Sequence, residues 1–355
     1  MPENPTPLLL AGRQIGVSLP CFVMAEAGVN HNGDVALAHQ LIDAAAAAGA
    51  DAVKFQTFDP EKIAAPAALK ADYQIENTGE TGSQLDMLRQ LVLPRPAYQE
   101  LMQHAADKGL IFLSTPFDQP SADFLYDLGI PAFKVSSGDV TNHPFLEQLA
   151  RSGLPILLST GMSTLAEVAS AVDAIRTSGN CPLALFHCVS NYPAAPDDCN
   201  LRAMETMRTA FGVPVGWSDH TDGIDISMAA VALGANLLEK HFTLDRGLPG
   251  PDHKASLEPD ELRDMVKAIR RIESALGDGI KQPVESEIPI ATIGRRSLYW
   301  RASLPEGAVV TPDDLTALRP ASGISPAEQA SLTRRRLARP VIAGEMVKPD
   351  DFEAK

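Results

Sequence analysis

Short apolar runs recur eight times between residues 21 and 242, and a segment with helical character separates each run from the next. Their apolar parts are nearly continuous, which is typical of strands covered on both faces. The intervening segments, such as DVALAHQLIDAAAAAGA and TLAEVASAVDAIRTSG, carry apolar residues at helical spacing and end at glycine. This alternation predicts a parallel α/β fold. The runs cover residues 21–29, 51–58, 110–117, 132–139, 155–161, 183–190, 214–220 and 236–242.

Eight strand–helix units in about 250 residues match the size of a (β/α)8 TIM barrel. A doubly wound open sheet is the alternative. Polar residues favour the barrel, because they gather toward the C-terminal ends of the runs, and in a barrel these ends form the mouth where active sites are built. These residues are Glu26, Lys54, Gln56, Thr115, Lys134, Ser137, Ser159, Ser190, Ser218, His220, Lys240 and His241.

Two further segments shape the expected domain organisation. Residues 59–93 form a connection too long for a simple barrel, and we expect a lid or a subunit contact there. Near the C-terminus the pattern G-x-x-V-x-P-D-D-apolar occurs twice, as GAVVTPDDL from Gly307 and GEMVKPDDF from Gly344. The stretch GDGIKQPVESEIP from Gly277, which contains Gly and Pro, is typical of a linker. We therefore predict a catalytic barrel over residues 1–280, a linker over 281–292, and a small pseudo-symmetric β-rich domain over 293–355.

Composition excludes several classes of function. The formal charge of -15 and the pI near 4.9 argue against a nucleic-acid or anionic-membrane partner, and the basic run Arg334 to Arg336 is interpreted as a solvated helix face. No segment approaches the roughly 20 apolar residues of a membrane span, and the opening residues lack a leader pattern. The four cysteines show no CxxC spacing, so we expect reduced thiols in the cytoplasm. An anionic substrate would need a locally positive pocket.

Two histidines near the ends of the last two runs, His220 and His241, predict a metal site. Neighbouring barrel strands would place them side by side, and two neutral imidazoles with open positions beside them suit a divalent transition metal. The alternative is that each histidine only makes a local hydrogen bond.

Lysines supply the positive charge that the acidic exterior lacks. Lys54 and Lys134 lie at strand ends, where burial is costly unless an anion is bound, so we expect phosphate or carboxylate there. A Schiff-base aldolase is the rival interpretation of a desolvated lysine. Glu26 could orient or deprotonate water, or it could form only a salt bridge. The hydroxyls that could complete a phosphate cradle are those of Thr115, Ser137, Ser159 and Ser218.

At this level of detail the sequence resembles the sialic acid synthase family, which includes N-acetylneuraminate and legionaminate synthases. The strings that carry the resemblance are AEAGVNHNGD, VKFQTF, STPFD, FKVSSGD, LSTGM, FHC followed by YP, WSDHT, EKHFTLD and GPDHKASLEPDEL. They occur in the family's order from about residue 21, and the tail, with RRSLYW and LRPASGISP, is similar to its antifreeze-like (β-clip) domain. The resemblance implies condensation of phosphoenolpyruvate with the aldehyde of an N-acyl aldose, with release of phosphate.

The resemblance also implies roles for individual residues. His220 and His241 would bind a divalent metal, usually Mn²⁺, with Mg²⁺ or Co²⁺ as alternatives, and Glu26 would be a catalytic carboxylate. A swapped homodimer would bring Arg319 of the tail into the neighbouring subunit's site. Phosphoenolpyruvate would contact Lys54, Thr115, Lys134, Ser137, Ser159 and Ser218, and the sugar would contact Gln56, Tyr192 and Asp252.

Departures from the family pattern concern sugar selectivity. Asp139 stands where the family often has glutamate, Ser190 where some members have asparagine, and LRPASG replaces KRPGNG around Arg319. We expect N-acetylmannosamine, or a close N-acyl aldose, as acceptor. The alternative is 2,4-diacetamido-2,4,6-trideoxymannose, the legionaminate precursor. A synthase for phosphorylated aldoses is a further possibility, as is a catalytically inactive barrel with a binding tail, which the intact set of polar residues disfavours.

Overall fold

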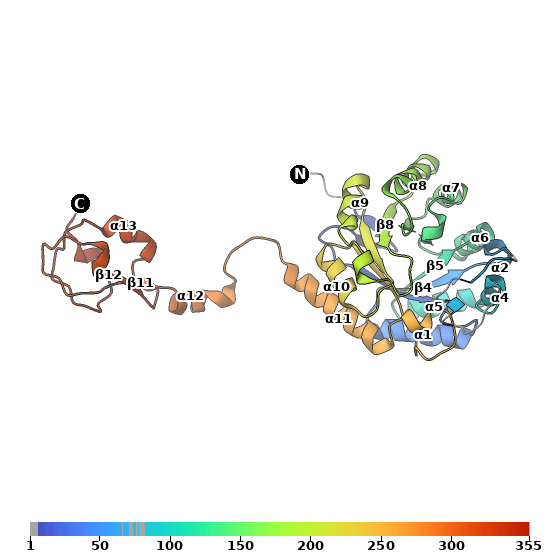
Figure 1. Cartoon of the computed structure of the whole chain (residues 1–355), viewed down its shortest axis with the longest axis horizontal. Coiled ribbons are helices and arrows are strands. Elements are labelled where there is room, and N and C mark those ends of the chain that lie inside the picture. The colour runs from blue at the N-terminus through green and yellow to red at the C-terminus, as the bar shows by residue number, and fades with distance from the viewer. Residues whose placement is uncertain (1–5, 66, 71–73, 76, 78–81, 355) are drawn as a thin grey trace. The chain divides into compact units, whose positions relative to one another are not determined.

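The computed structural model describes residues 6–65, 67–70, 74, 75, 77 and 82–354 (Figure 1). The chain divides into two compact units, Met1–Gly277 and Asp278–Lys355. Each unit is described by itself below.

Within the described residues of the first unit, eight parallel strands close into a barrel, which confirms the TIM-barrel prediction and rules out the open sheet. Each predicted apolar run contains one of these strands. The eighth strand of the barrel pairs with both the first and the seventh, so the first and last strands lie side by side and close the barrel. The strands are β3 (Phe22–Gly28), β4 (Ala52–Thr57), β5 (Ile111–Pro116), β6 (Phe133–Val135), β7 (Ile156–Ser159), β8 (Leu183–Cys188), β9 (Val215–Asp219) and β10 (Leu237–His241).

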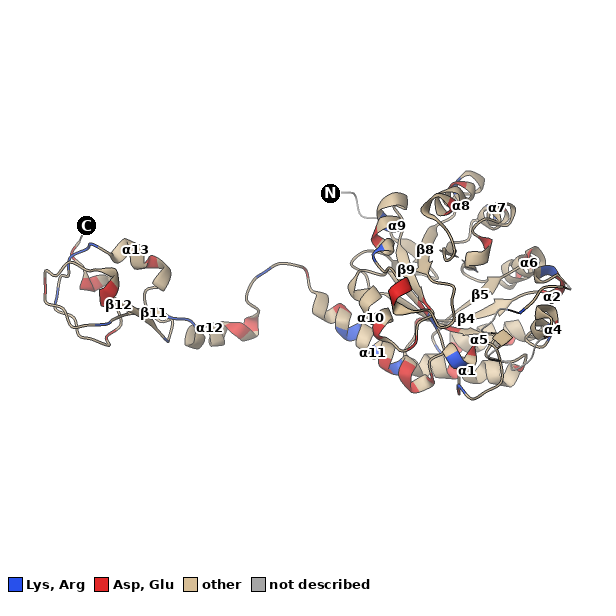
Figure 2. Ribbon diagram, in the orientation of Figure 1, with Lys and Arg blue, Asp and Glu red and all other residues tan. Residues whose placement is uncertain are grey.

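Helices cover the outside of this barrel (Figure 1). α1 begins at an N-cap, where Asp34 accepts a hydrogen bond from the backbone of Ala36, and it ends at Gly49, whose positive φ of 81° terminates the helix. Basic and acidic residues share the outer surface of α11 (Figure 2). The outer helices are α1 (Val35–Ala48), α5 (Ala97–Asp107), α6 (Gln119–Leu128), α7 (His143–Arg151), α8 (Leu165–Ser178), α9 (Ala203–Phe211), α10 (Asp225–Ala232) and α11 (Pro259–Leu276).

A hairpin that the sequence did not reveal closes one end of the barrel. It consists of β1 (Leu8–Leu10) and β2 (Arg13–Ile15), which pair antiparallel. Leu8, Leu10 and Ile15 pack in one apolar cluster with inward residues at the start of the barrel strands, including Phe22 and Leu237. Because this plug fills the N-terminal end, the opposite end remains available for a cavity.

The long connection after β4 contains α2 (Pro60–Ile63) and α4 (Gln84–Arg89) among its described residues. Part of the segment predicted as a lid or subunit contact, residues 66, 71–73, 76 and 78–81, lies outside the described residues. Within the described part, Phe58, Met87 and Leu91 form a small apolar cluster with Val29.

The second unit contains the internal repeat. Both copies use glycine with positive φ, 77° at Gly307 and 89° at Gly344, and both continue into a short 3₁₀ turn. Leu315 and Phe352, which end the two repeats, are buried in its core. The elements of this unit are η4 (Glu285–Glu287), α12 (Ile288–Gly294), β11 (Ser297–Trp300), η5 (Pro312–Asp314), β12 (Leu315–Leu318), η6 (Pro326–Glu328), α13 (Gln329–Leu332) and η7 (Pro349–Asp351).

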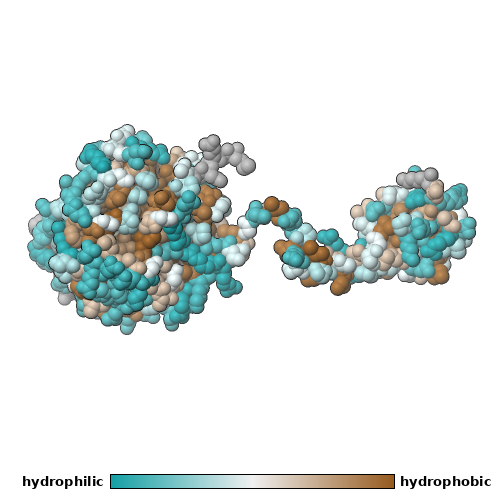
Figure 3. All heavy atoms as spheres, turned by 180° about the vertical axis from the view of Figure 1, so that it is seen from behind, coloured by the Kyte–Doolittle hydropathy of each residue, from teal (hydrophilic) through white to brown (hydrophobic). Residues whose placement is uncertain are grey.

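Isoleucines on α12, which begins inside the segment predicted as a linker and ends just beyond it, are exposed: Ile288 by 59%, Ile290 by 65% and Ile293 by 70%. Figure 3 shows apolar surface over this part of the chain. Among the helices formed by described residues, none has the length and apolarity needed to cross a membrane.

Candidate active site

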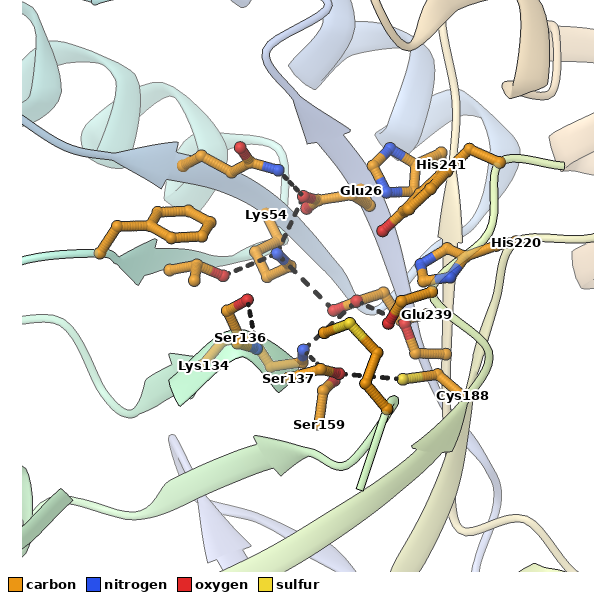
Figure 4. Close-up of a pocket in the computed structure, with 18 of the residues that line it drawn as sticks. Glu26, Lys54, Lys134, Ser136, Ser137, Ser159, Cys188, His220, Glu239 and His241 are labelled. Atoms are coloured by element: carbon orange, nitrogen blue, oxygen red, sulfur yellow. Dashed lines mark hydrogen bonds and ion pairs between the residues drawn. The ribbon is translucent and has the colours of Figure 1, made fainter. Parts of the chain in front are cut away.

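A cavity of about 450 Å³ opens at the C-terminal end of the barrel (Figure 4). Side chains alternate along each strand, so that every second residue points inward. On β10 this rule places Glu239 and His241 in the cavity and Lys240 on the outer side of the wall. The cavity thus draws its polar lining from strands that are far apart in the sequence.

Two buried lysines and two buried carboxylates form the centre of the cavity (Figure 4). Nζ of Lys54 lies 2.9 Å from Oε1 of Glu26 and 3.8 Å from Oε2 of Glu239. Nζ of Lys134 lies 3.4 Å from Oε1 of Glu239. Glu239 therefore bridges the two ammonium groups, and this pairing offsets part of the cost of burying them.

Hydroxyl groups complete the surroundings of these lysines. Lys54 donates a hydrogen bond of 2.8 Å to Oγ1 of Thr115, and Lys134 donates one of 2.7 Å to Oγ of Ser159. Ser218 donates to Oε1 of Glu239 over 2.8 Å. The cavity thus brings two ammonium groups and three hydroxyls together, and these are groups that can bind an anionic substrate in an acidic protein.

The two carboxylates differ in their protonation behaviour. Burial raises the pKa of Glu26 to about 7, although Lys54 opposes this shift. Burial would also raise the pKa of Glu239, but Lys134 and Lys54 outweigh it and hold that pKa low. One carboxyl is thus set to exchange a proton near neutral pH while the other stays charged.

His220 and His241 lie next to each other at the same mouth, with ring centroids 5.6 Å apart. The ring of Tyr192 packs against His220 at a tilt of 34°, with centroids 4.1 Å apart, and meets His241 edge-on at 5.7 Å. Burial lowers the pKa of both imidazoles, that of His220 to about 4, so both are neutral at pH 7. Neutral imidazole is the form that binds metal ions.

Hydrogen bonding leaves nitrogen lone pairs on these rings for a cation. Nδ1 of His220 lies 2.6 Å from the carbonyl oxygen of Val189 and must carry the proton, so Nε2 has a lone pair. Nδ1 of His241 is buried and has no hydrogen-bond partner among the described residues. Also among these residues, no group of three or more His, Cys, Asp or Glu side chains is arranged to hold a metal. The pair therefore fits an open site, in which water or substrate fills the other positions.

The remaining predicted residues divide into two groups. Gln56, Ser137, Ser190 and Tyr192 line the same cavity as Glu26, the lysines, their hydroxyl partners and the histidines. Gln56 donates to Oε1 of Glu26 over 3.2 Å.

Three predicted residues do not line this cavity. Asp139 accepts a hydrogen bond of 3.0 Å from Asn142. Asp252 lines an adjoining chamber. Arg319 is exposed in the second unit, at the end of β12.

Comparison with known proteins agrees with this geometry. Residues 41–281 match the NeuB family, and residues 295–353 match the SAF domain. The chain belongs to the NeuB family.

Named relatives are similar over nearly their whole length. A protein of Legionella pneumophila named N,N'-diacetyllegionaminic acid synthase is 45% identical over 343 residues, which cover 96% of each chain. One of the same name from Campylobacter jejuni is 47% identical over 306 residues, covering 86% of this chain and 92% of that protein. The crystal structure of an N-acetylneuraminic acid synthetase from Leptospira borgpetersenii superposes with a TM-score of 0.71 at 36% identity, covering 82% of this chain and 96% of the other.

Within this NeuB-family site, sequence reasoning missed Glu239 and Cys188. Cys188 lies with Sγ 3.2 Å from Oγ of Ser137, which in turn accepts a hydrogen bond from the backbone of Gly161. The signal for Glu239 was present, because a residue two positions before His241 in a strand shares its face. We expected Lys240 at the mouth, but it lies between Glu239 and His241 in β10 and therefore faces outward, where it pairs with Asp219.

Proposed function

We propose that the protein joins phosphoenolpyruvate to the open-chain aldehyde of an N-acyl aldose, adds water and releases inorganic phosphate. The observation that carries this proposal is the pair of buried lysines beside the histidine pair in one cavity of a NeuB-family barrel. A trianionic substrate such as phosphoenolpyruvate would find its counter-charges in Lys54 and Lys134. Hydroxyls of Thr115 and Ser159 would hold these ammonium groups in place.

His220 and His241 are the residues that would hold a divalent metal, for which we propose Mn²⁺. Bound there, the metal would supply Lewis-acid polarisation of the sugar aldehyde. The chain itself supplies two neutral imidazoles, that of His220 from the loop after β9 and that of His241 from the end of β10. Tyr192 packs against both rings.

Glu26 is proposed to act on water. C3 of phosphoenolpyruvate forms a bond to the aldehyde carbon, water then adds to the cationic C2, and the proton that this water loses is the one that the aldehyde oxygen gains on becoming a hydroxyl. A carboxylate with a pKa near 7 can accept the proton of that water at neutral pH. The tetrahedral C2 then expels phosphate by cleavage of the bond between C2 and the bridging oxygen, so the water oxygen stays in the sugar acid.

For the acceptor, the comparisons favour 2,4-diacetamido-2,4,6-trideoxymannose over N-acetylmannosamine. The two relatives named legionaminic acid synthases are 45% and 47% identical to this chain, whereas the N-acetylneuraminic acid synthetase from Leptospira borgpetersenii is 36% identical. Both acceptors share the 2-acylamino aldose that the proposed chemistry requires.

We also propose that the protein works as a domain-swapped homodimer in the cytoplasm. Exposed isoleucines of α12 and the exposed Arg319 support a contact with a second copy, and the four free cysteines are typical of a reducing compartment. Mixing inactive Arg319→Ala and His220→Ala variants tests the swap, because mixed dimers would regain one intact site. No recovery after subunit exchange would contradict it.

Phosphate release in the presence of phosphoenolpyruvate and each candidate acceptor tests the proposed reaction. In heavy-oxygen water, the label should enter the sugar acid and not the released phosphate. Labelled phosphate would contradict the proposed bond cleavage. Borohydride with pyruvate should trap no adduct, since a trapped adduct would indicate a Schiff-base aldolase.

A further inference from the structure

A second chamber of about 230 Å³ opens beside the active cavity. The two spaces share part of their lining, including Gln56, Phe117, Tyr192 and His241, and are therefore adjacent. At about 30 Å³ per water, this chamber has room for a substituent of several heavy atoms.

The wall of this side chamber that lies away from the lysines is apolar. Val29 follows β3, Phe58 follows β4, and Met87 and Leu91 come from α4 and the turn after it. These four residues form one buried cluster, against which Ile63, Leu88 and Phe117 pack. Such a wall favours methyl groups and offers no hydrogen bond to a hydroxyl.

The rest of the side chamber is polar: its lining includes Asp252, the amides of Gln56, Gln74 and Gln84, and the hydroxyl of Ser136. Asp252 lies in the loop before η3 (His253–Ala255), and burial raises its pKa to about 6. Glu26 lies on the cavity side, bonded to the Gln56 that both spaces share. A phosphate placed in the side chamber would therefore meet the Asp252 carboxyl and an apolar wall, because neither Lys54 nor Lys134 lines this chamber.

The position of the side chamber relates it to the acceptor. Under the proposed function, the aldehyde carbon faces His220 and His241, while phosphoenolpyruvate occupies the lysine side. The rest of the sugar must then extend away from the lysines. His241 and Tyr192 border both spaces, so an acceptor whose aldehyde lies at the histidines reaches the side chamber with its other substituents.

We propose that this side chamber is the specificity pocket for the acceptor, which binds methyl-bearing substituents of a deoxygenated, N-acylated aldose and rejects a phosphate at that place. The inference rests on the proposed function and goes beyond it by naming the residues that select the substrate class. One methyl or methylene group in an apolar pocket changes kcat/KM by about 10- to 200-fold. The trideoxy diacetamido sugar should therefore exceed N-acetylmannosamine by at least about 10-fold, and N-acetylmannosamine 6-phosphate should be a poorer acceptor still.

The test compares kcat/KM for these three acceptors in the full-length wild-type protein and in Met87→Gln, which keeps the length of the side chain and adds an amide to the wall. We expect the ratio of kcat/KM for the trideoxy sugar over that for N-acetylmannosamine to fall by about 10-fold. Val29→Thr, which has nearly the same shape and adds one hydroxyl, should shift the ratio in the same direction. Met102→Gln on α5, a half-buried methionine away from the side chamber, is the matched control and should leave the ratio unchanged.

The outcomes separate the inference from the proposed function. If the wild-type protein turns over none of the three sugars with phosphoenolpyruvate, the proposed function fails, and the inference fails with it. If turnover occurs but the wild-type protein prefers N-acetylmannosamine or its phosphate, only the specificity pocket is overturned. The same holds if Met87→Gln and Val29→Thr, checked for folding by thermal unfolding, leave the ratio as it is in the wild type.

Discussion

On the outer side of the barrel wall, Nζ of Lys240 lies 3.2 Å from Oδ2 of Asp219. Both side chains are buried. These two residues directly precede His241 and His220, whose side chains line the cavity. Asp219 also accepts hydrogen bonds from the backbone nitrogen and the hydroxyl of Thr221, at 2.9 and 2.7 Å, while Lys240 donates to the carbonyl oxygen of Thr221. This ion pair thus holds the residues on both sides of His220.

Breaking this ion pair should destabilise the barrel and displace His220. We expect Lys240→Met to lower the free energy of unfolding by about 3–5 kcal/mol, because it leaves the Asp219 carboxylate buried without its counter-ion. Adding Asp219→Asn to the same chain should recover part of the loss. Urea unfolding measures both effects. Arg151→Ala removes an exposed pair with Glu147 and should cost less than about 1 kcal/mol, so equal losses in the two single variants would contradict the prediction.

The raised pKa of Glu26 predicts a pH-dependent rate. If its carboxylate accepts a proton from water, kcat/KM should rise with pH to a plateau, with a midpoint near 7. Glu26→Gln should lower kcat by about 10²- to 10⁴-fold, the usual contribution of a general base. Steady-state kinetics from pH 5.5 to 8.5 tests this. A variant with a nearly unchanged rate would show that Glu26 is structural.

The same shift has a consequence for stability. Between the ordinary pKa of 4.5 and the raised pKa of about 7, the folded protein binds more protons at Glu26 than the unfolded chain does. The contribution of Glu26 to the free energy of unfolding therefore falls as pH rises through this window. Relative to Glu26→Gln, the wild type should lose stability from pH 4.5 to 7 in urea unfolding without added metal. Parallel curves for the two proteins would argue against the shift.

Removal of divalent metal should abolish turnover. Dialysis against a chelator should bring the rate to background, and Mn²⁺ should restore it. His220→Ala and His241→Ala should lose Mn²⁺ binding in calorimetry as well as activity. His187→Gln is the matched control, because Nε2 of His187 contacts the backbone oxygen of Cys199, at 2.8 Å, outside the cavity. Full activity after complete metal removal would refute the metal role.

The internal repeat offers a matched pair of aspartates in the second unit. Asp351 is fully buried, accepts a hydrogen bond of 3.0 Å from Nε1 of Trp300 and pairs with Arg339, whereas its counterpart Asp314 is partly exposed. Asp351→Ala leaves the indole N–H buried without its acceptor. It should lower the local unfolding free energy by about 2–4 kcal/mol, and Asp314→Ala by about 1 kcal/mol or less. Hydrogen exchange over residues 295–353 of the full chain measures both, and similar exchange in the two variants would contradict the difference.

Local pattern was sufficient to predict much of this molecule. The eight buried strands, the repeat at Gly307 and Gly344, and the placement of Lys54, Lys134, His220 and His241 at the cavity all follow from chemistry carried by short segments. An apolar run must be covered on both faces, and the polar groups at its end must find partners. The sequence of such a segment therefore indicates that the segment is buried and that its polar end lies in a polar site.

Only the tertiary structure decided which of these groups meet. Closure of the barrel pairs His241 with Glu26, although they are far apart in the chain, and inward alternation places Glu239 between the two lysines. The hairpin plug and the side chamber at Met87 arise from contacts between distant segments, which leave little trace in local composition. Sequence by itself determined the strands and the chemical groups available, whereas the pairing of strands around the barrel determined the distances between those groups. Long-range contacts set those distances, and no single segment contains them.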